Sequence, residues 1–325
     1  MQREKAQWLL PVAVTAAALV GGVQTAFGQE IRSSSASSVA VAMDNASLTI
    51  AVGQRPLMKY RHGDVPFKPY VAELYSPGGV QILRDSPKDH QHHHALMFAV
   101  GVDGVDFWAE TPVDGKQKTR SLAGVRSSIR NGDARAWFTH ELDWVEPAGK
   151  TLAVERRTIE VAPLGGPVPA TVLTWRSRLA PPAGKTSIEL FGSHYFGLGM
   201  RLVESMDLGG RFFNAANDEG ENVRGSERLA AAKWCAYAAT ADGKPVTVAV
   251  FDAPDNARHP ARMFTMSPPF AYLAATLNLW KEPLRVEAKK PLELRYGVAL
   301  WDGTVEPEQV EAAYQRWVRS GADAK

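Results

Sequence analysis

The chain has 325 residues, of which 45% are hydrophobic and 22% are charged, which excludes general disorder and allows a sizeable core. A net charge of +2 argues against a nucleic-acid partner and against binding to an acidic membrane surface. The single cysteine, Cys235, excludes intramolecular disulfides and thiolate-rich metal sites.

The first 28 residues have the pattern of a secretory signal peptide. Charged residues at positions 3–5 precede a mostly apolar run over residues 8–23, and Ala26-Phe27-Gly28 is a small-x-small site of the kind that signal peptidase cuts. We predict cleavage after Gly28 and a periplasmic or secreted mature protein with a net charge of +1, since the cut removes two basic residues and one acidic residue. An uncleaved membrane anchor is the alternative, but the run contains Pro11 and is short for a span.

A Ser-rich stretch over residues 29–45 follows, which we predict to be a mobile linker ahead of a single domain over residues 46–320. In that domain apolar and polar residues alternate along short runs that end in Gly, Pro, Asn or Asp turn signals, a pattern typical of β-strands. Strands are predicted at residues 47–52, 71–75, 80–83, 151–161, 170–179, 187–191, 246–251 and 292–300.

The C-terminal segment is the one stretch with convincing helical periodicity. Val310, Ala313, Tyr314 and Trp317 are spaced to share one face of a helix that begins near residues 305–308. Many strands separated by turn signals imply a sandwich or a barrel. The predicted fold class is therefore all-β, a large antiparallel β-sandwich with a C-terminal helix.

Four of the eight histidines fall within five positions, between a stretch rich in Pro and Gly and the apolar run at residues 95–100. They are His90, His92, His93 and His94, and their flanks predict that a loop carries them into a buried strand. Neutral imidazole is the commonest metal ligand and has a pKa near neutrality, so the cluster indicates either a divalent-metal site or proton transfer. For a metal, the ligands would be His90, His92 and His93. If the run is an extended strand entry, His90, His92 and His94 share one face; if it is a loop, His90 and His93 could converge instead. A structural or surface role is the third interpretation.

Two further histidines and one loop carry candidate site residues. His140 lies in a predicted strand, and His194 lies among glycines that allow close approach of a ligand to the backbone. A buried, hydrogen-bonded core histidine is an equal alternative for each. Donors suited to sugar hydroxyls or a carboxylate follow the strand at residues 246–251, where a turn with its own internal bonds is the alternative. They are Asn256, Arg258 and His259.

Several segments resemble the signatures of an exported bacterial family of unknown function that is often labelled methane oxygenase PmoA. They are Lys68-Pro69-Tyr70, Arg84-Asp85, Asp89-His90 with His92-His93, residues 103–108, residues 232–235 and residues 252–260. The resemblance implies a secreted β-sandwich over about residues 46–318, and the family's frequent place among sugar-degrading proteins favours a carbohydrate context. The methane monooxygenase subunit behind the label is a bundle of transmembrane helices, and none is predicted here after residue 28. We therefore carry over neither methane oxidation nor a copper centre.

We accordingly expect an enzyme that acts on carbohydrate, either a lyase, a hydrolase or an epimerase. Its sandwich would be similar to the supersandwich of galactose mutarotases and polysaccharide lyases. His90 or His93 would act as general acid or base, with His194 or His140 as its partner, because a positioned histidine accelerates proton transfer by ~10²–10⁴-fold.

The expected substrate-binding side chains carry hydrogen-bond donors or an aromatic face. Arg84, Asn256, Arg258 and His259 would hold the sugar, and Trp108 would stack on it. One alternative is a metal-dependent enzyme in which His194 completes the ligand set of the cluster. The other is a non-catalytic glycan-binding sandwich with structural histidines. The expected partner in each case is a carbohydrate or related small molecule, with no nucleic acid and no membrane after signal cleavage.

Overall fold

The computed structural model describes residues 39–130 and 133–322. The predicted signal peptide, residues 1–28, and residues 29–38 of the predicted linker lie outside the described residues. Within the described ranges, no helix combines the length and the apolar character needed to span a membrane.

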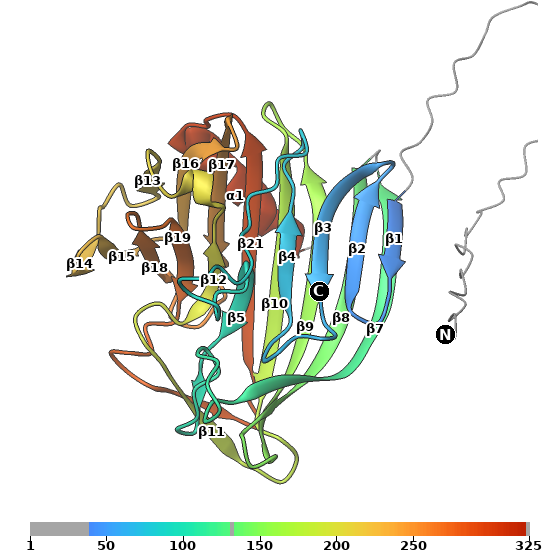
Figure 1. Ribbon diagram of the computed structural model, residues 1–325, viewed down its shortest axis with the longest axis vertical. Coiled ribbons are helices and arrows are strands. Elements are labelled where there is room, and N and C mark those ends of the chain that lie inside the picture. The colour runs from blue at the N-terminus through green and yellow to red at the C-terminus, as the bar shows by residue number, and fades with distance from the viewer. Residues whose placement is uncertain (1–38, 131–132, 323–325) are drawn as a thin grey trace, which may run out of the picture. The chain divides into compact units, whose positions relative to one another are not determined.

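The described chain forms two large antiparallel sheets, one small sheet and one α-helix, as the predicted all-β sandwich with a C-terminal helix requires (Figure 1). In spatial order, the first sheet contains β1 (Val39–Met43), β2 (Ser47–Val52), β3 (Arg55–Arg61), β4 (Tyr70–Leu74), β5 (Leu96–Ala99), β12 (Gly197–Arg201), β19 (Tyr272–Thr276), β18 (Arg262–Met266), β15 (Glu227–Ala231) and β14 (Glu221–Arg224). The second sheet contains β13 (Arg211–Asn214), β16 (Trp234–Ala241), β17 (Lys244–Asp252), β21 (Leu292–Asp302), β10 (Ala170–Ala180), β9 (Thr151–Leu164), β8 (Asp133–Val145) and β7 (Lys116–Arg130). The small sheet contains β20 (Leu284–Glu287), β11 (Ser187–Phe191) and β6 (Gly101–Val102), and the helical segments are η1 (Glu204–Met206) and α1 (Pro307–Ala322).

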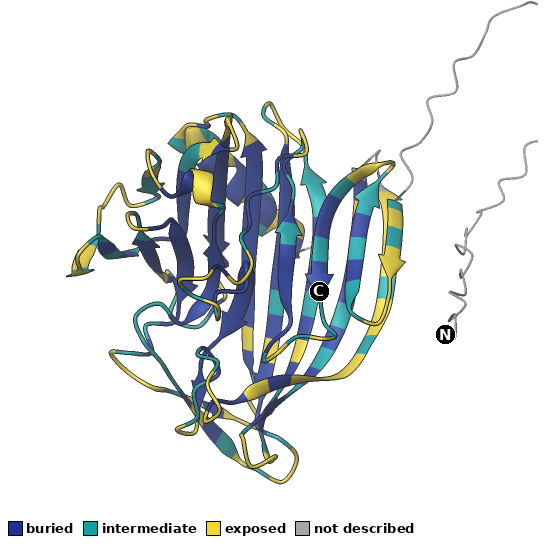
Figure 2. Ribbon diagram, in the orientation of Figure 1, coloured by how far each residue is buried: buried dark blue, intermediate teal, exposed yellow. Residues whose placement is uncertain are grey.

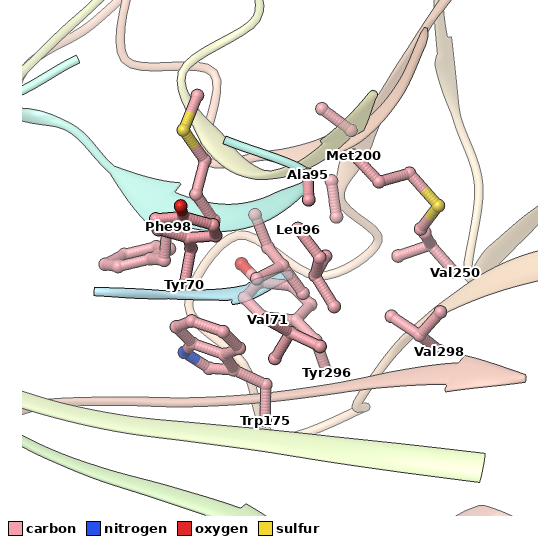
Figure 3. Packing of buried hydrophobic residues seen from close by; sticks show 14 of the residues in the cluster. Tyr70, Val71, Ala95, Leu96, Phe98, Trp175, Met200, Val250, Tyr296 and Val298 are labelled. Atoms are coloured by element: carbon pink, nitrogen blue, oxygen red, sulfur yellow. The ribbon is translucent and has the colours of Figure 1, made fainter. Parts of the chain in front are cut away.

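The main hydrophobic core lies between the two large sheets. In Figure 3, Val71, Leu96 and Phe98 from the first sheet pack near Trp175 and Tyr296 from the second. All five side chains are buried, and the central strands of both sheets are dark blue in Figure 2. Burial of apolar surface on both inner faces is therefore what joins the two sheets.

The second sheet is also covered on its other face, because successive side chains of a strand point in opposite directions. In β21, Val298 and Leu300 belong to the core between the sheets, whereas Ala299 and Trp301 belong to a second cluster with α1. The helix contributes the face that the sequence predicts, with Val310, Ala313, Tyr314 and Trp317 all buried in that second cluster.

The predicted linker ends earlier than expected. Val39–Met43 forms β1 and pairs with β2, with Val39 opposite Val52 and Met43 opposite Leu48. Val39 and Val41 are half-buried against the core while Ala40 is exposed, so this short apolar alternation is sufficient for an edge strand. The predicted boundary between linker and domain, at residue 45, is therefore corrected to lie before residue 39.

One ion pair lies inside the sandwich, where both partners are fully buried. Arg157 of β9 donates from Nε and Nη2 to the carboxylate of Glu155, at 3.0 and 2.8 Å. It also donates to the hydroxyl of Tyr60 at 3.2 Å, to the side-chain oxygen of Gln117 at 2.8 Å and to the carbonyl of Pro69 at 3.0 Å. One guanidinium therefore links β9 and β7 of the second sheet to β3 of the first.

We predict that Arg157→Met destabilises the protein by ~3–5 kcal/mol, because it leaves the Glu155 carboxylate buried without its cation. The measurement is urea unfolding at neutral pH. Arg156→Met is the matched control, since Arg156 is the next residue of β9, has an exposed side chain and pairs with Glu141 at 3.5 Å. That variant should change the unfolding free energy by less than ~1 kcal/mol. Equal losses in both variants would contradict the role assigned to the buried pair.

Candidate active site

A cavity of about 470 Å³ lies where β15, β18 and β19 meet the loop that carries the histidine cluster. One part of its lining is aromatic and consists of Trp108, Tyr195, Phe264, Phe270 and Tyr272. The other part is polar and consists of His90, His92, His93, Arg224, Ser226 and Glu227. The cavity therefore offers both flat apolar faces and hydrogen-bonding groups, within the ~300–1,000 Å³ that small-molecule sites usually have.

The histidine loop comprises residues 85–94 and is closed at its base by an isolated β-bridge between Asp85 and His94. Inside it, the amide of His93 donates to the carbonyl of His90 at 2.9 Å, and the amide of Ser86 donates to the carbonyl of His93 at 2.9 Å. The rings of His90 and His93 stack with centroids 4.6 Å apart. The loop leads into β5, as the sequence predicts, and its two expected partners do converge.

His90 is held by a carboxylate that is itself held by an arginine. Its Nδ1 lies 3.0 Å from Oδ2 of Asp89, and Nη2 of Arg201 donates to the same oxygen at 3.1 Å. Burial opposes ionisation of Asp89, but these two hydrogen bonds outweigh it and lower the pKa of Asp89 to about 2. The carboxylate is thus an acceptor for Nδ1–H, which leaves Nε2 of a neutral His90 as the proton acceptor. The side chain of His90 is 38% exposed, so a ligand can reach it.

A second histidine–carboxylate pair stands at the β15 side of the cavity. Nε2 of His194 lies 3.0 Å from Oε2 of Glu227, and Nη2 of Arg224 donates to Oε1 of Glu227 at 2.6 Å. The hydroxyl of Ser193 lies 3.2 Å from Nδ1 of His194. Glu227 lines the cavity, whereas His194 stands behind it, so His194 orients this carboxylate.

His93, Trp108 and Tyr272 form the buried floor of the cavity, and each carries a polar atom without a partner among the described residues. Nδ1 of His93, Nε1 of Trp108 and the hydroxyl of Tyr272 form no hydrogen bond within the described part of the chain. Burial, reinforced by the positive neighbours of the ring, lowers the pKa of His93 to about 2, so His93 is neutral. Trp108 is buried and stacks on Phe196 at 5.1 Å, which makes it part of the floor rather than an open stacking platform. Each unmet polar atom costs ~1–3 kcal/mol, and such costs are tolerated mainly at functional sites.

The cluster does not have the geometry of the predicted metal site. Across residues 39–130 and 133–322, no group of three His, Cys, Asp or Glu side chains is arranged to hold a metal ion. Instead the rings of His90 and His93 stack on each other, while His92 meets His93 edge-on with ring centroids 4.7 Å apart. The prediction of His90, His92 and His93 as ligands is corrected on this ground, and His194 is bonded to Glu227 instead of completing the set.

His140 does not lie at the cavity. It is fully buried in the core, where Nδ1 lies 2.9 Å from the Tyr60 hydroxyl and Nε2 lies 3.0 Å from Oγ1 of Thr119. Burial lowers the pKa of His140 to about 3, so it is a neutral hydrogen-bonding group. The structure thus places His140 in the core role that its strand position equally allowed, and separates it from His90.

The four predicted sugar-holding residues also lie elsewhere. Asn256 and His259 both donate to the buried carboxylate of Asp252, at 2.6 and 2.7 Å. Arg258 donates to the carbonyls of residues 277, 282 and 283, at 2.9, 2.7 and 3.0 Å. Arg84 forms ion pairs with Glu204 and Asp207. These donors are engaged in holding loops in place, which corrects their assignment to substrate.

Several residues at or beside the cavity were not predicted as site residues from the sequence. Asp89 directly precedes His90, and an acidic neighbour of a candidate base is a signal that would have found it. Arg224 and Glu227 stand on the two strands of the β14–β15 hairpin and have no local motif that marks them. Among the aromatic residues, Phe264, Phe270 and Tyr272 belong to the β18–β19 hairpin, whereas Tyr195 comes from a distant segment that only folding brings beside them.

An ionic network around His94 connects two segments that contribute to the cavity, with His94 and Lys68 buried and Asp85 exposed. Nδ1 of His94 lies 2.8 Å from Asp85, and Nε2 of His94 lies 3.0 Å from Glu110. Glu110 is also paired with the buried Lys68, whose Nζ donates to the carbonyl of Trp108 at 2.9 Å. The network therefore ties the base of the histidine loop to the segment that carries Trp108, and so joins two walls of the cavity.

Protonation of this network is set by its internal hydrogen bonds. Burial disfavours the charged form of His94, but the bonds to Asp85 and Glu110 outweigh burial and raise the pKa of His94 above its ordinary 6.5. Burial likewise opposes ionisation of both carboxyls, and the bonds from His94 and its neighbours still lower their pKa values from 3.8 and 4.5. The two carboxylates beside His94 therefore favour its charged form, which persists to a higher pH than in an ordinary histidine.

A family model described as "Family of unknown function (DUF6807)" matches residues 47–315. The matched segment runs from the start of β2 into α1 and includes every residue named above as lining the cavity. No curated protein matches the chain.

We predict that the stability lost in His94→Asn is larger at mildly acidic pH than at alkaline pH. Because folding raises the pKa of His94, its contribution is present below pH 6.5 and is lost as the pH rises through the folded value. The carboxyls contribute above their ordinary pKa values, so the difference in unfolding free energy between parent and variant should be largest between about pH 4.5 and 6.5. Urea unfolding at several pH values measures it.

His92→Asn is the control for this experiment, because burial lowers the pKa of His92. Its contribution therefore has the opposite sign, and the stability difference between parent and His92→Asn should grow as the pH rises toward 6.5. A His94→Asn difference that is constant from pH 5 to 9 is the result that would refute a charged His94.

Proposed function

The chain belongs to a family of unknown function, DUF6807, and we propose that it is a carbohydrate-active enzyme in which His90 transfers protons at the cavity. Membership of a family of unknown function agrees with the sequence resemblance, whereas the methane oxygenase name attached to that resemblance is not tested by the match. We further propose that the protein is exported, on the signal-peptide pattern of residues 1–28.

The observation that carries the proposal is the chain of contacts Arg201–Asp89–His90. A carboxylate that accepts from Nδ1–H fixes the tautomer and the orientation of an imidazole, and leaves the other nitrogen to exchange protons with a substrate. Arg201 is buried, and its guanidinium lies 3.5 Å from the ring centroid of Phe270, so the supporting end of the chain is held rigidly. His90 itself borders the cavity and remains accessible.

The lining of the cavity supports a sugar as the ligand. A sugar ring has flat apolar faces and an edge of hydroxyl groups, and it is bound where aromatic side chains stand beside hydrogen-bonding groups. Tyr195 and Phe264 provide aromatic surface, while Arg224, Ser226 and Glu227 provide polar atoms. The similarity to galactose mutarotases and polysaccharide lyases remains a prediction from the sequence.

Among the three expected reaction types, the geometry favours a lyase or an epimerase over a hydrolase. Glycoside hydrolysis generally uses two carboxyl groups beside the scissile bond. Glu227 is the one carboxylate among the described residues that line the cavity, and both of its oxygens are already bonded, to His194 and to Arg224. A lyase or an epimerase instead needs a base for a carbon-bound proton, and His90 fits that task. His194 is a positioning residue for Glu227, and His93 is part of the floor.

The test compares His90→Gln with the parent protein on a panel of disaccharides and glycosides that includes uronic acids. Reactions in D₂O followed by NMR detect both product and deuterium incorporated from solvent. We expect His90→Gln to lower turnover by ~10²–10⁴-fold, because it removes the proton acceptor. The ligand dissociation constant should change by only a few-fold, since the cavity keeps its shape.

His259→Gln is the matched control. His259 also bonds a carboxylate through Nδ1, at 2.7 Å from Asp252, but it lies outside the cavity. Turnover in His259→Gln should equal that of the parent. Unchanged turnover in His90→Gln would contradict the proposal, and so would a parent protein that binds sugars tightly but converts none. The second result would identify a glycan-binding module.

A further inference from the structure

The carboxylate that lines the cavity, Glu227, has both of its oxygens bonded to the protein, and Asp89, which supports His90, is bonded through one oxygen. Glu227 accepts from Arg224 at Oε1 and lies within hydrogen-bonding distance of His194 at Oε2. Asp89 bonds both His90 and Arg201 through Oδ2. A sugar hydroxyl that donated to one of these oxygens would compete with a charged or ring N–H donor already in place, and such charge-assisted bonds are the stronger ones.

The capacity left over belongs mostly to donors. Arg224 lines the cavity, its side chain is 77% exposed, and one of the five N–H donors of its guanidinium is engaged with Glu227. Nε1 of Trp108, which also lines the cavity, has no partner in the part of the chain that the structure describes. Both groups can only donate. They are therefore complementary to a ligand group that accepts.

We infer, on the basis of the proposed function, that the sugar bound here carries a carboxylate, as a uronic acid does, and that Arg224 receives this group. A planar carboxylate accepts two parallel N–H bonds from a guanidinium, a match that a neutral hydroxymethyl group cannot reproduce. Arg224 ends β14 beside Gly225, which has a positive φ of 54°, so the guanidinium stands at the accessible tip of an edge hairpin.

The same substrate class accounts for the chemistry. A carboxylate on the reacting carbon acidifies the C–H bond beside it. When His90 takes that proton on Nε2, the C–H bond breaks, an N–H bond forms, and the electron pair spreads onto the carboxylate oxygens. The charge that develops there is stabilised by the guanidinium of Arg224. Both an epimerase and a lyase begin with this step.

The test uses matched acidic and neutral disaccharides: digalacturonate with galactobiose, dimannuronate with mannobiose, and cellobiouronate with cellobiose. Isothermal titration calorimetry measures each dissociation constant for the full mature protein at low and at high salt. We expect the acidic member of at least one pair to bind 10-fold or more tightly than its neutral partner. Salt should reduce this preference, because Arg224 is exposed and its charge is screened.

Three variants test which residue produces the preference for the acidic disaccharide. Arg224→Gln should abolish the preference by weakening binding of the acidic member far more than binding of its neutral partner, and Arg224→Lys should retain part of it, because the charge remains but the paired donors do not. Arg262→Gln is the control, since Arg262 is an exposed residue of β18 that is not among the described residues lining the cavity. It removes the same charge from the same sheet and should leave the preference intact.

Equal or tighter binding of the neutral member in every pair overturns the inference, and so does an acidic preference that survives in Arg224→Gln. If neutral sugars bind and are turned over with dependence on His90, the proposed function stands and only the substrate class is wrong. If no sugar binds or reacts, the proposed function fails together with the inference.

Discussion

The shape of the cavity depends on the ionic network around His94. The loops that border the cavity are not held by the hydrogen bonds of a sheet ladder, so another interaction has to hold them in place. Asp85 and His94 close the base of the histidine loop, while Glu110 and Lys68 join that base to the carbonyl of Trp108. Because a buried charge without a partner costs several kcal/mol, the buried Lys68 and His94 depend on the carboxylates beside them. The network therefore joins the histidine loop to the segment that carries Trp108.

Histidines around this wall differ in chemistry because their carboxylate partners differ. His94 is buried, but its bonds to two carboxylates outweigh burial and favour its charged form, which gives it a structural role. His90 has one carboxylate and an accessible ring, which suits it to exchange protons with a ligand. His93 has none and is buried, so it stays neutral. Three histidines within five positions thus acquire different protonation behaviour and different roles from burial and pairing alone.

The site was predictable only where its residues share a short segment. His90 and His93 were expected at the site and do line the cavity, because the loop that carries them could be located from its Pro, Gly and apolar flanks. Trp108, on a later segment, was expected there and lines the cavity as well. Asn256 and His259 were expected there as well, but a buried carboxylate, Asp252, takes their donors. Residue type alone cannot tell a donor that waits for a ligand from a donor that holds its own loop.

Alternation of apolar residues determined the all-β class and the buried face of the C-terminal helix, since both follow from the two-residue and 3.6-residue periods of local backbone geometry. Tertiary structure alone decided which strands became neighbours, and so which side chains met. Glu227 reaches His194 across 33 positions, and Arg201 reaches Asp89 across 112. Such pairings depend on long-range strand order, which local periodicity does not encode. The histidine cluster was therefore visible in the sequence, but its acid–base partners were not.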